Sequence, residues 1–236
     1  GTKAAAFGIL LRILHTGFGV VVDATGEPIL ETVDLSSRWM AALSVLAVLT
    51  MILGNLLALV QDRLKRLLAY SSVAHAGYLL LGLIAPFNIG ARNVLFYLLV
   101  YTFMTVGAFV IISLFQTEDG EDADHLNQVA GLWKRHPVLA LAMGVFMFSM
   151  IGIPPMAGFT GKYVIFMSAL ESGHVWLAAV MGLAAVIGAA YYLRVIVAIF
   201  FQAPEKDAAD LARVNGAAVF AISLAVAGTL ILGILP

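Results

Sequence analysis

The 236-residue sequence contains no cysteine, so it has no disulfide, no cysteine-held iron–sulfur cluster and no thiolate zinc site of its own. Any redox chemistry must therefore belong to partner proteins. Charge is also scarce, because only 11% of the residues are charged, compared with about 25% in a soluble domain. The net charge of −1 gives no reason to expect nucleic acid, which needs clustered lysine and arginine. These shortages indicate a chain adapted to lipid.

The sequence is instead rich in hydrophobic residues, which make up 62% of it and give a mean hydropathy of +1.00. Apolar runs of about 20 residues, rising about 1.5 Å per residue, match a hydrocarbon core of about 30 Å. The runs lack the alternating polar residues of barrel strands, so we predict an all-α integral membrane protein. Seven transmembrane helices are expected, at residues 4–22, 39–60, 67–86, 94–115, 138–170, 176–201 and 214–235.

The positions of tryptophan and of basic residues indicate how these helices are oriented. Trp39, Trp133 and Trp176 lie at span edges, where the headgroup region favours such rings. Successive loops on alternate sides would place Arg63, Lys65, Arg66, Lys134, Arg135, Lys206 and Arg213 together, opposite Arg38 and Arg92. The positive-inside rule then predicts that the first side is cytoplasmic and the C-terminus outside. A chance asymmetry is the alternative.

Two weak motifs do not indicate a ligand site. The acidic run at residues 118–124 lacks the oxygen spacing and closing glutamate of a calcium loop, which favours a solvated linker. Gly17-Phe18-Gly19 lacks the third glycine of a nucleotide fingerprint and lies in a lipid-length helix. We therefore predict no metal and no cofactor in this chain.

The segment at 138–170 is too long for one straight span, since its 33 residues would extend about 50 Å. Pro154 and Pro155 remove adjacent amide donors, which predicts half-helices at about 138–151 and 157–170. A break at membrane depth requires surrounding protein or a water-filled cavity. A simple proline kink is the alternative. Lys162, just beyond the prolines, favours the break, because a charge at this depth is costly unless it has a function.

Ionisable residues inside the spans are functional candidates, because charge in a bilayer is expensive. No aspartate or glutamate lies in a span, whereas six basic residues lie within or at the edges: Lys3, Arg12, His15, His75, Lys162 and Arg194. Arg194 lies close enough to the end of its span for its side chain to reach the membrane–water interface, so a structural role is as well supported as a functional one. Arg12 and His15 share a face and are weak candidates, as helix-contact anchors.

His75 lies near the middle of its span and shares a helical face with Ser71 and Tyr78. Such a stripe can relay protons through water, or it can hold helices together by hydrogen bonds, and the pattern supports both interpretations. The next helix carries a second hydroxyl stripe, for which packing is the favoured interpretation: Tyr97, Tyr101 and Thr105.

Three stretches carry a resemblance to a known family. They are GTKAAAF at residues 1–7, GNLLALVQDRLKRLLAYSSVAHAGY at 54–78 and GIPPMAGFTGK at 152–162. Together they resemble the family shared by the antiporter-like subunits of respiratory complex I and the Mrp cation/proton antiporters, and the likeness covers essentially the whole chain. The resemblance implies the eighth to fourteenth helices of a fourteen-helix inverted-repeat fold. Because the chain opens on Gly1 rather than Met, we expect a truncated start.

The resemblance also implies a function and a division of the chain. It implies a proton-translocating membrane-arm subunit of NADH:quinone oxidoreductase, a translocase without a redox site of its own, coupled to quinone reduction elsewhere. Lys3 would be the central relay lysine, His75 a relay or gating residue, and Lys162 the terminal lysine of the second half-channel. Residues 1–22 would form a relay helix, 39–201 a five-helix channel repeat and 214–236 a C-terminal transmembrane helix.

The expected partners are other membrane-arm subunits and the lipid bilayer, with flavin, iron–sulfur clusters and quinone in partner subunits. The expected location is the inner (plasma) membrane of a bacterium rather than an organelle. Two other functions are open, a subunit of a secondary Na⁺/H⁺ antiporter and a structural scaffold. Sodium is usually bound by several oxygens, including carboxylates, which these spans lack. A scaffold would have little use for Lys162 at a broken helix.

Overall fold

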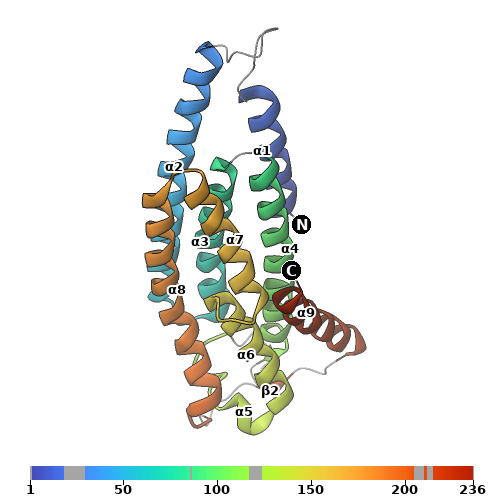
Figure 1. The fold of residues 1–236 in the computed structure, drawn as a ribbon. Helices are drawn as coiled ribbons and strands as arrows, with labels where there is room; N and C mark the ends of the chain where they lie inside the picture. Colours follow the sequence, from blue (N-terminus) through green and yellow to red (C-terminus); the bar gives the residue numbers. More distant parts are fainter. Residues whose placement is uncertain are drawn as a thin grey trace.

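The fold is a helical bundle, described here from a computed structural model over residues 2–18, 30–85, 87–116, 124–204, 210–211 and 215–235 (Figure 1). In chain order the elements are α1 (Thr2–Phe18), α2 (Leu30–Leu59), α3 (Leu64–Ile84), α4 (Phe87–Ile112), β1 (Phe115–Gln116), α5 (Leu132–Arg135), α6 (Pro137–Ile151), α7 (Ala157–Glu171), α8 (Val175–Phe201), β2 (Asp210–Leu211) and α9 (Gly216–Ile234). The helical prediction is confirmed, although β1 and β2 add a short antiparallel pair, and β1 takes up Phe115, the last residue of the predicted span 94–115.

Among the residues that the structure describes, five helices are long and apolar enough to cross a membrane: α2 from Arg38, α3, α4 from Ile89, α8 and α9. The chain is therefore a multi-pass membrane protein. The other two predicted segments correspond to α1, with 17 residues, and to α6 and α7, with 15 residues each. The break in the fifth segment is thus a real interruption between two half-helices rather than a kink.

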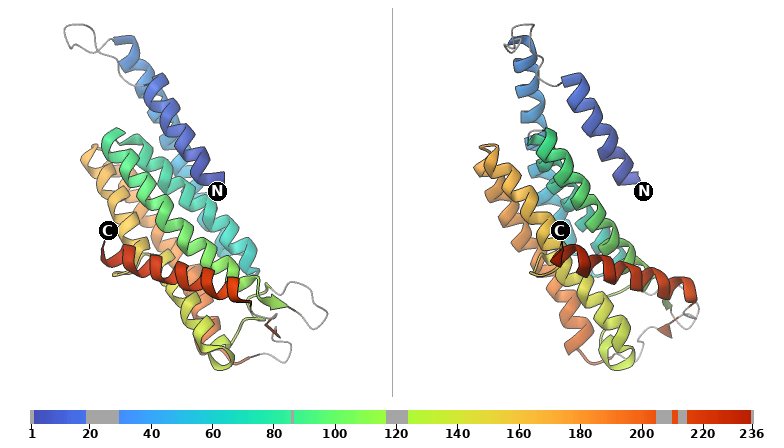
Figure 2. Two further views of the ribbon diagram at one scale, coloured as in Figure 1. Left: turned by 90° about the vertical axis from the view of Figure 1, so that its right-hand side faces the viewer. Right: turned by 45° about the vertical axis from the view of Figure 1, so that its right-hand side comes forward.

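The helices surround α3, which is the most buried of the five long spans, whereas α9 is the least buried. Contacts join α3 to α2, α4, α7 and α8, and α9 crosses α4 and α7 at a steep angle (Figure 2). One apolar cluster fills the half of the bundle around α6, and a second fills the half around α7. The break between these helices consequently lies where the two clusters meet.

The second predicted span, 39–60, agrees with the membrane-crossing part of α2, which runs from Arg38 to Leu59, although the helix itself begins earlier, at Leu30. Its first turns carry Glu31, Asp34 and Arg38, so hydropathy marks where the helix becomes apolar and not where it begins. Of the acidic run, residues 118–123 lie outside the described part of the chain. Asp124 is buried and lies 4.0 Å from Arg63, at the turn between α2 and α3.

Candidate functional site

The two half-helices end at the positions that the sequence predicts. Helix α6 ends at Ile151, and Gly152 follows with φ of 92°, a left-handed conformation that favours glycine at a helix C-terminus. Helix α7 then begins at Ala157. The connection consequently contains both prolines at the meeting point of the two apolar clusters.

Lys162 replaces the hydrogen-bond donors that the prolines remove. In a continuous helix, the carbonyls of Met150 and Ile151 would accept from the residues four positions on, but these are Pro154 and Pro155, which have no N–H. The ammonium of Lys162 donates to both carbonyls instead, at 2.7 and 2.9 Å. The side chain is 9% exposed, so the charge is buried at the break as predicted.

A second contact crosses the break in the opposite direction. The backbone N–H of Gly158, in the first turn of α7, donates to the hydroxyl oxygen of Ser149 in α6 at 2.9 Å. N–H groups in a first helical turn have no partner within their own helix, so Ser149 satisfies one of them. Each half-helix therefore supplies a side chain that satisfies the end of the other, which fixes the position of Lys162.

His75 is buried in α3 and connects three helices. Its Nδ1 lies 2.6 Å from the hydroxyl of Tyr97 in α4, and its Nε2 lies 3.1 Å from the hydroxyl of Tyr192 in α8. The ring of Tyr101 is 4.8 Å away between centroids. Both ring nitrogens of His75 thus have a hydroxyl partner.

Tyr78 links this region to Lys162. It lies one turn after His75, and the Lys162 ammonium is 5.5 Å from the centroid of its ring. The Tyr78 hydroxyl is 3.5 Å from the amide nitrogen of Asn55, whose oxygen accepts a hydrogen bond from Tyr191 at 2.9 Å. The predicted face of Ser71, His75 and Tyr78 is therefore confirmed as buried.

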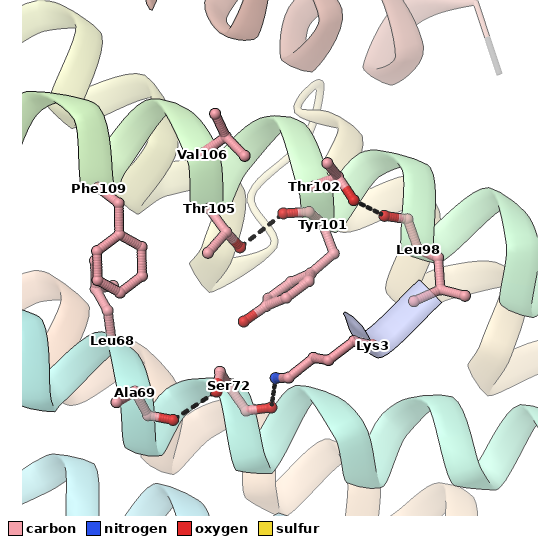
Figure 3. Close-up of a pocket in the computed structure, with 10 residues that line it drawn as sticks. All are labelled: Lys3, Leu68, Ala69, Ser72, Leu98, Tyr101, Thr102, Thr105, Val106 and Phe109. Carbon is pink, nitrogen blue, oxygen red and sulfur yellow. Dashed lines mark hydrogen bonds between the residues drawn. The ribbon is translucent and has the colours of Figure 1, made fainter. Parts of the chain in front are cut away.

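Lys3 lies at the edge of a cavity between α3 and α4 (Figure 3). Its ammonium donates to the carbonyl of Ser72 at 2.6 Å and lies 5.2 Å from the centroid of Tyr101. The cavity measures about 380 Å³, and the hydroxyl groups of Ser72, Tyr101 and Thr105 contribute to its lining. A space of this size holds several waters beside the lysine.

The structure brings the three predicted relay residues into one region without direct contact. The ammonium of Lys3 lies over the ring of Tyr101 and that of Lys162 over the ring of Tyr78, and both of these rings contact the ring of His75. Within the described part of the chain, no hydrogen bond joins Lys3, His75 and Lys162 directly. A proton moving among them would need hydroxyl groups or water as carriers.

The weaker candidates have structural roles or lie outside the site. Arg194 donates to the carbonyl of Gln61 and lies 3.6 Å from Asp62, so it holds the turn between α2 and α3. Arg12 is exposed, and the side chain of His15 lies outside the described part of the chain. Thr105 donates to the Tyr101 carbonyl, whereas Tyr97, for which packing was the favoured interpretation, contacts His75 through its hydroxyl.

Four residues of the site were not predicted from the sequence: Asn55, Ser149, Tyr191 and Tyr192. Asn55 could have been identified from the sequence, because it is an amide inside an apolar run, where polar groups usually form hydrogen bonds with a neighbouring helix. For Tyr191 and Tyr192, the hydroxyl groups were the only indication of a polar role in the sequence. Helical periodicity does not predict which distant helix these side chains contact. In the part of the chain that the structure describes, no group of three or more His, Cys, Asp or Glu residues is placed to hold a metal.

The sequence and fold match known membrane proteins. Residues 13–188 match the family described as NADH:quinone oxidoreductase/Mrp antiporter, TM. NADH-quinone oxidoreductase subunit N of Trichlorobacter lovleyi is 43% identical over all 236 residues, which cover 45% of that relative, so the chain spans about half the length of the relatives it matches. A chain of Thermus thermophilus respiratory complex I with bound aureothin has a TM-score of 0.74 and 30% identity, covering 100% of this chain and 65% of that one.

The fold also occurs outside complex I. The Mrp complex of a Dietzia species has a TM-score of 0.78 at 22% identity, covering 98% of this chain and 48% of the other, which shows a shared fold. The family match covers about three quarters of the chain, from α1 into α8. It includes all of the elements that carry His75 and Lys162. The chain belongs to the transmembrane NADH:quinone oxidoreductase/Mrp antiporter family.

Proposed function

We propose that this chain forms a proton-translocating half-channel in a membrane-arm subunit of an NADH:quinone oxidoreductase, with Lys3, His75 and Lys162 as its relay. The observation that carries the proposal is the buried His75, which contacts two hydroxyl groups and lies on α3 between Ser72, the contact of Lys3, and Tyr78, the contact of Lys162. The family and the subunit N relatives support the same assignment. Flavin, iron–sulfur clusters and quinone would belong to partner subunits.

The chemistry of His75 suits transfer rather than storage of a proton. A neutral imidazole has one donor nitrogen and one acceptor nitrogen, and a tyrosine hydroxyl can both donate and accept. A proton can therefore arrive at one nitrogen and leave from the other while the hydroxyls of Tyr97 and Tyr192 rotate. Repulsion between like charges in a buried site then favours one mobile charge at a time among Lys3, His75 and Lys162.

A secondary sodium antiporter is the alternative, and the buried side chains do not favour it. Among the described residues, the buried carboxylate is Asp124, which lies in the connection before α5 and not in a span. Sodium sites in transporters draw on backbone carbonyls, but the two carbonyls at the break already accept Lys162. Protons are therefore the better supported cargo.

The same assignment also implies the partners of the chain, its membrane location and the roles of its segments. Other membrane-arm subunits would cover the faces of the bundle that expose large apolar residues, and the rest would face lipid. A bacterial inner membrane, with the basic loops on the cytoplasmic side, fits the bacterial relatives and the charge asymmetry. Residues 1–22 would carry the relay lysine, 39–201 the channel, and 214–236 the covering helix.

The test compares Lys162→Ala and Lys162→Arg in the intact complex in membrane vesicles. A relay lysine must release its proton, so both variants should lose proton uptake and coupled quinone reduction while the complex still assembles. If Lys162 served only to satisfy the α6 carbonyls, Ala would disturb assembly and Arg would be tolerated. Lys134→Ala, which removes an exposed charge, is the matched control.

Normal pumping by the Lys162→Arg complex would refute a proton-release role. Replacing sodium with choline in the same vesicles separates the two cargoes, because proton uptake by the wild-type complex should not change. A loss of transport without sodium would favour the antiporter alternative.

A further inference from the structure

The C-terminal end of α6 has the chemistry of a cation site. Carbonyl oxygens at the end of a helix carry the negative partial charge of the helix dipole. The oxygens of Met150 and Ile151 both point at the same ammonium, at 2.7 and 2.9 Å. Because Pro154 and Pro155 follow at the positions that would normally donate, no helical N–H competes for these oxygens.

Two further features favour a cation at this point. The aromatic ring of Tyr78 lies 5.5 Å from the ammonium of Lys162, and the face of such a ring attracts positive charge. The ion pairs found in the described part of the chain do not include Lys162, so the carbonyls and the ring, rather than a carboxylate, hold its charge. The position is also buried, with Lys162 only 9% exposed.

We propose that the end of α6 is a monovalent-cation site that Lys162 fills with its own ammonium, acting as a tethered cation that keeps sodium and potassium out. Carbonyls at the C-terminal ends of broken helices are the groups that bind sodium in transporters built with such helices. The lysine therefore occupies the place that a metal ion would take. Only the consequence for transport specificity rests on the proposed function, because occupancy of the site is a property of the fold.

The path of the lysine stem supports this role. A Cβ atom added at Gly152 would lie 3.2 Å from Cδ of Lys162, so the glycine leaves room for the stem to pass the end of α6. Truncating Lys162 to alanine would empty this path and leave the carbonyls of Met150 and Ile151 without this donor. A hydrated sodium or potassium ion could then reach these carbonyl oxygens and bind them in place of the lysine ammonium.

The experiment measures equilibrium binding of ²²Na⁺ and the thermal unfolding midpoint of the purified intact complex in NaCl, KCl or choline chloride at one ionic strength. We expect Lys162→Ala to bind about one sodium more than wild type and to show a saturable rise in midpoint with NaCl or KCl. Lys162→Met fills the same path with an apolar chain and should gain neither. Lys3→Ala, which frees a carbonyl inside helix α3, should also gain neither.

The results decide the proposal without measuring transport. Sodium binding by the Ala complex but not by the Met complex supports it, whereas binding by wild type, or by none of the variants, overturns it. If the Ala complex does not assemble in either salt, Lys162→Ser, which also truncates the side chain and empties the path, is measured in its place and decides by the same criterion. Loss of pumping without sodium binding would leave the proposed relay standing and remove only this inference.

Discussion

The two hydroxyl contacts of His75 differ in length, so we expect that removing each one lowers the stability of the protein by a different amount. Tyr97 lies 2.6 Å from Nδ1 and Tyr192 lies 3.1 Å from Nε2, and all three side chains are buried. Substituting phenylalanine for either tyrosine keeps the ring and removes one hydroxyl. Each variant leaves one imidazole nitrogen without its partner, so the two changes can be compared directly.

The expected magnitude follows from the membrane environment. A buried polar group without a partner costs about 1–3 kcal/mol in soluble proteins. Interhelical side-chain hydrogen bonds in membranes average about 0.6 kcal/mol and reach about 1.7 kcal/mol. The shorter contact should lie near the upper value, so we expect about 1.5 kcal/mol for Tyr97→Phe and about 0.5 kcal/mol for Tyr192→Phe. The first change alters the folded-to-unfolded ratio about tenfold.

Reversible unfolding by a denaturing detergent measures this difference, and proton uptake in vesicles measures the consequence for the relay. The control is Tyr163→Phe, because Tyr163 is 51% exposed on α7. Both buried variants should also slow proton uptake, whereas the control should not. A larger cost for Tyr192→Phe than for Tyr97→Phe, or a cost no greater than that of the control, would refute the reasoning.

Two further predictions concern packing and orientation. Gly54→Ala should destabilise the α2–α3 contact by about 1–3 kcal/mol, because an added Cβ would lie 2.5 Å from the backbone nitrogen of Ala74; Gly182→Ala, with no atom within 4 Å, serves as the control in the same unfolding assay. Because the chain has no cysteine, Lys134→Cys and Arg92→Cys can each be labelled alone, and a membrane-impermeant thiol reagent should reach the first from the cytoplasmic side and the second from outside. The reverse labelling would contradict the proposed orientation.

The sequence predicted the break well because its cause is local. Adjacent prolines lack two N–H groups wherever they occur, and a glycine just before them allows a left-handed end. The half-helices therefore begin and end within about one residue of the predicted positions. The burial of His75 and Lys162 was predictable for a related reason, since a polar residue inside an apolar run must find partners within the protein.

What the sequence could not predict is which distant groups these residues meet. Periodicity places His75 on a face of α3. Its partners Tyr97, in α4, and Tyr192, in α8, are 22 and 117 residues away from it along the chain, and periodicity does not identify them. The same limit applies to the start of α2. Hydropathy detects contact with lipid, whereas the first turns of α2 are helical without being apolar.

The contacts of Lys162 join its structural and proposed functional roles. A hydrogen bond from a charged donor contributes about 1.5–3 kcal/mol, compared with about 0.5–1.5 kcal/mol from a neutral one. If Lys162 releases its proton, its bonds to Met150 and Ile151 weaken, and no backbone N–H can replace them because prolines follow at those positions. The end of α6 is therefore held most firmly when Lys162 is charged. In the proposed relay, proton release by Lys162 would therefore be coupled to the geometry of the break through the same two carbonyl oxygens.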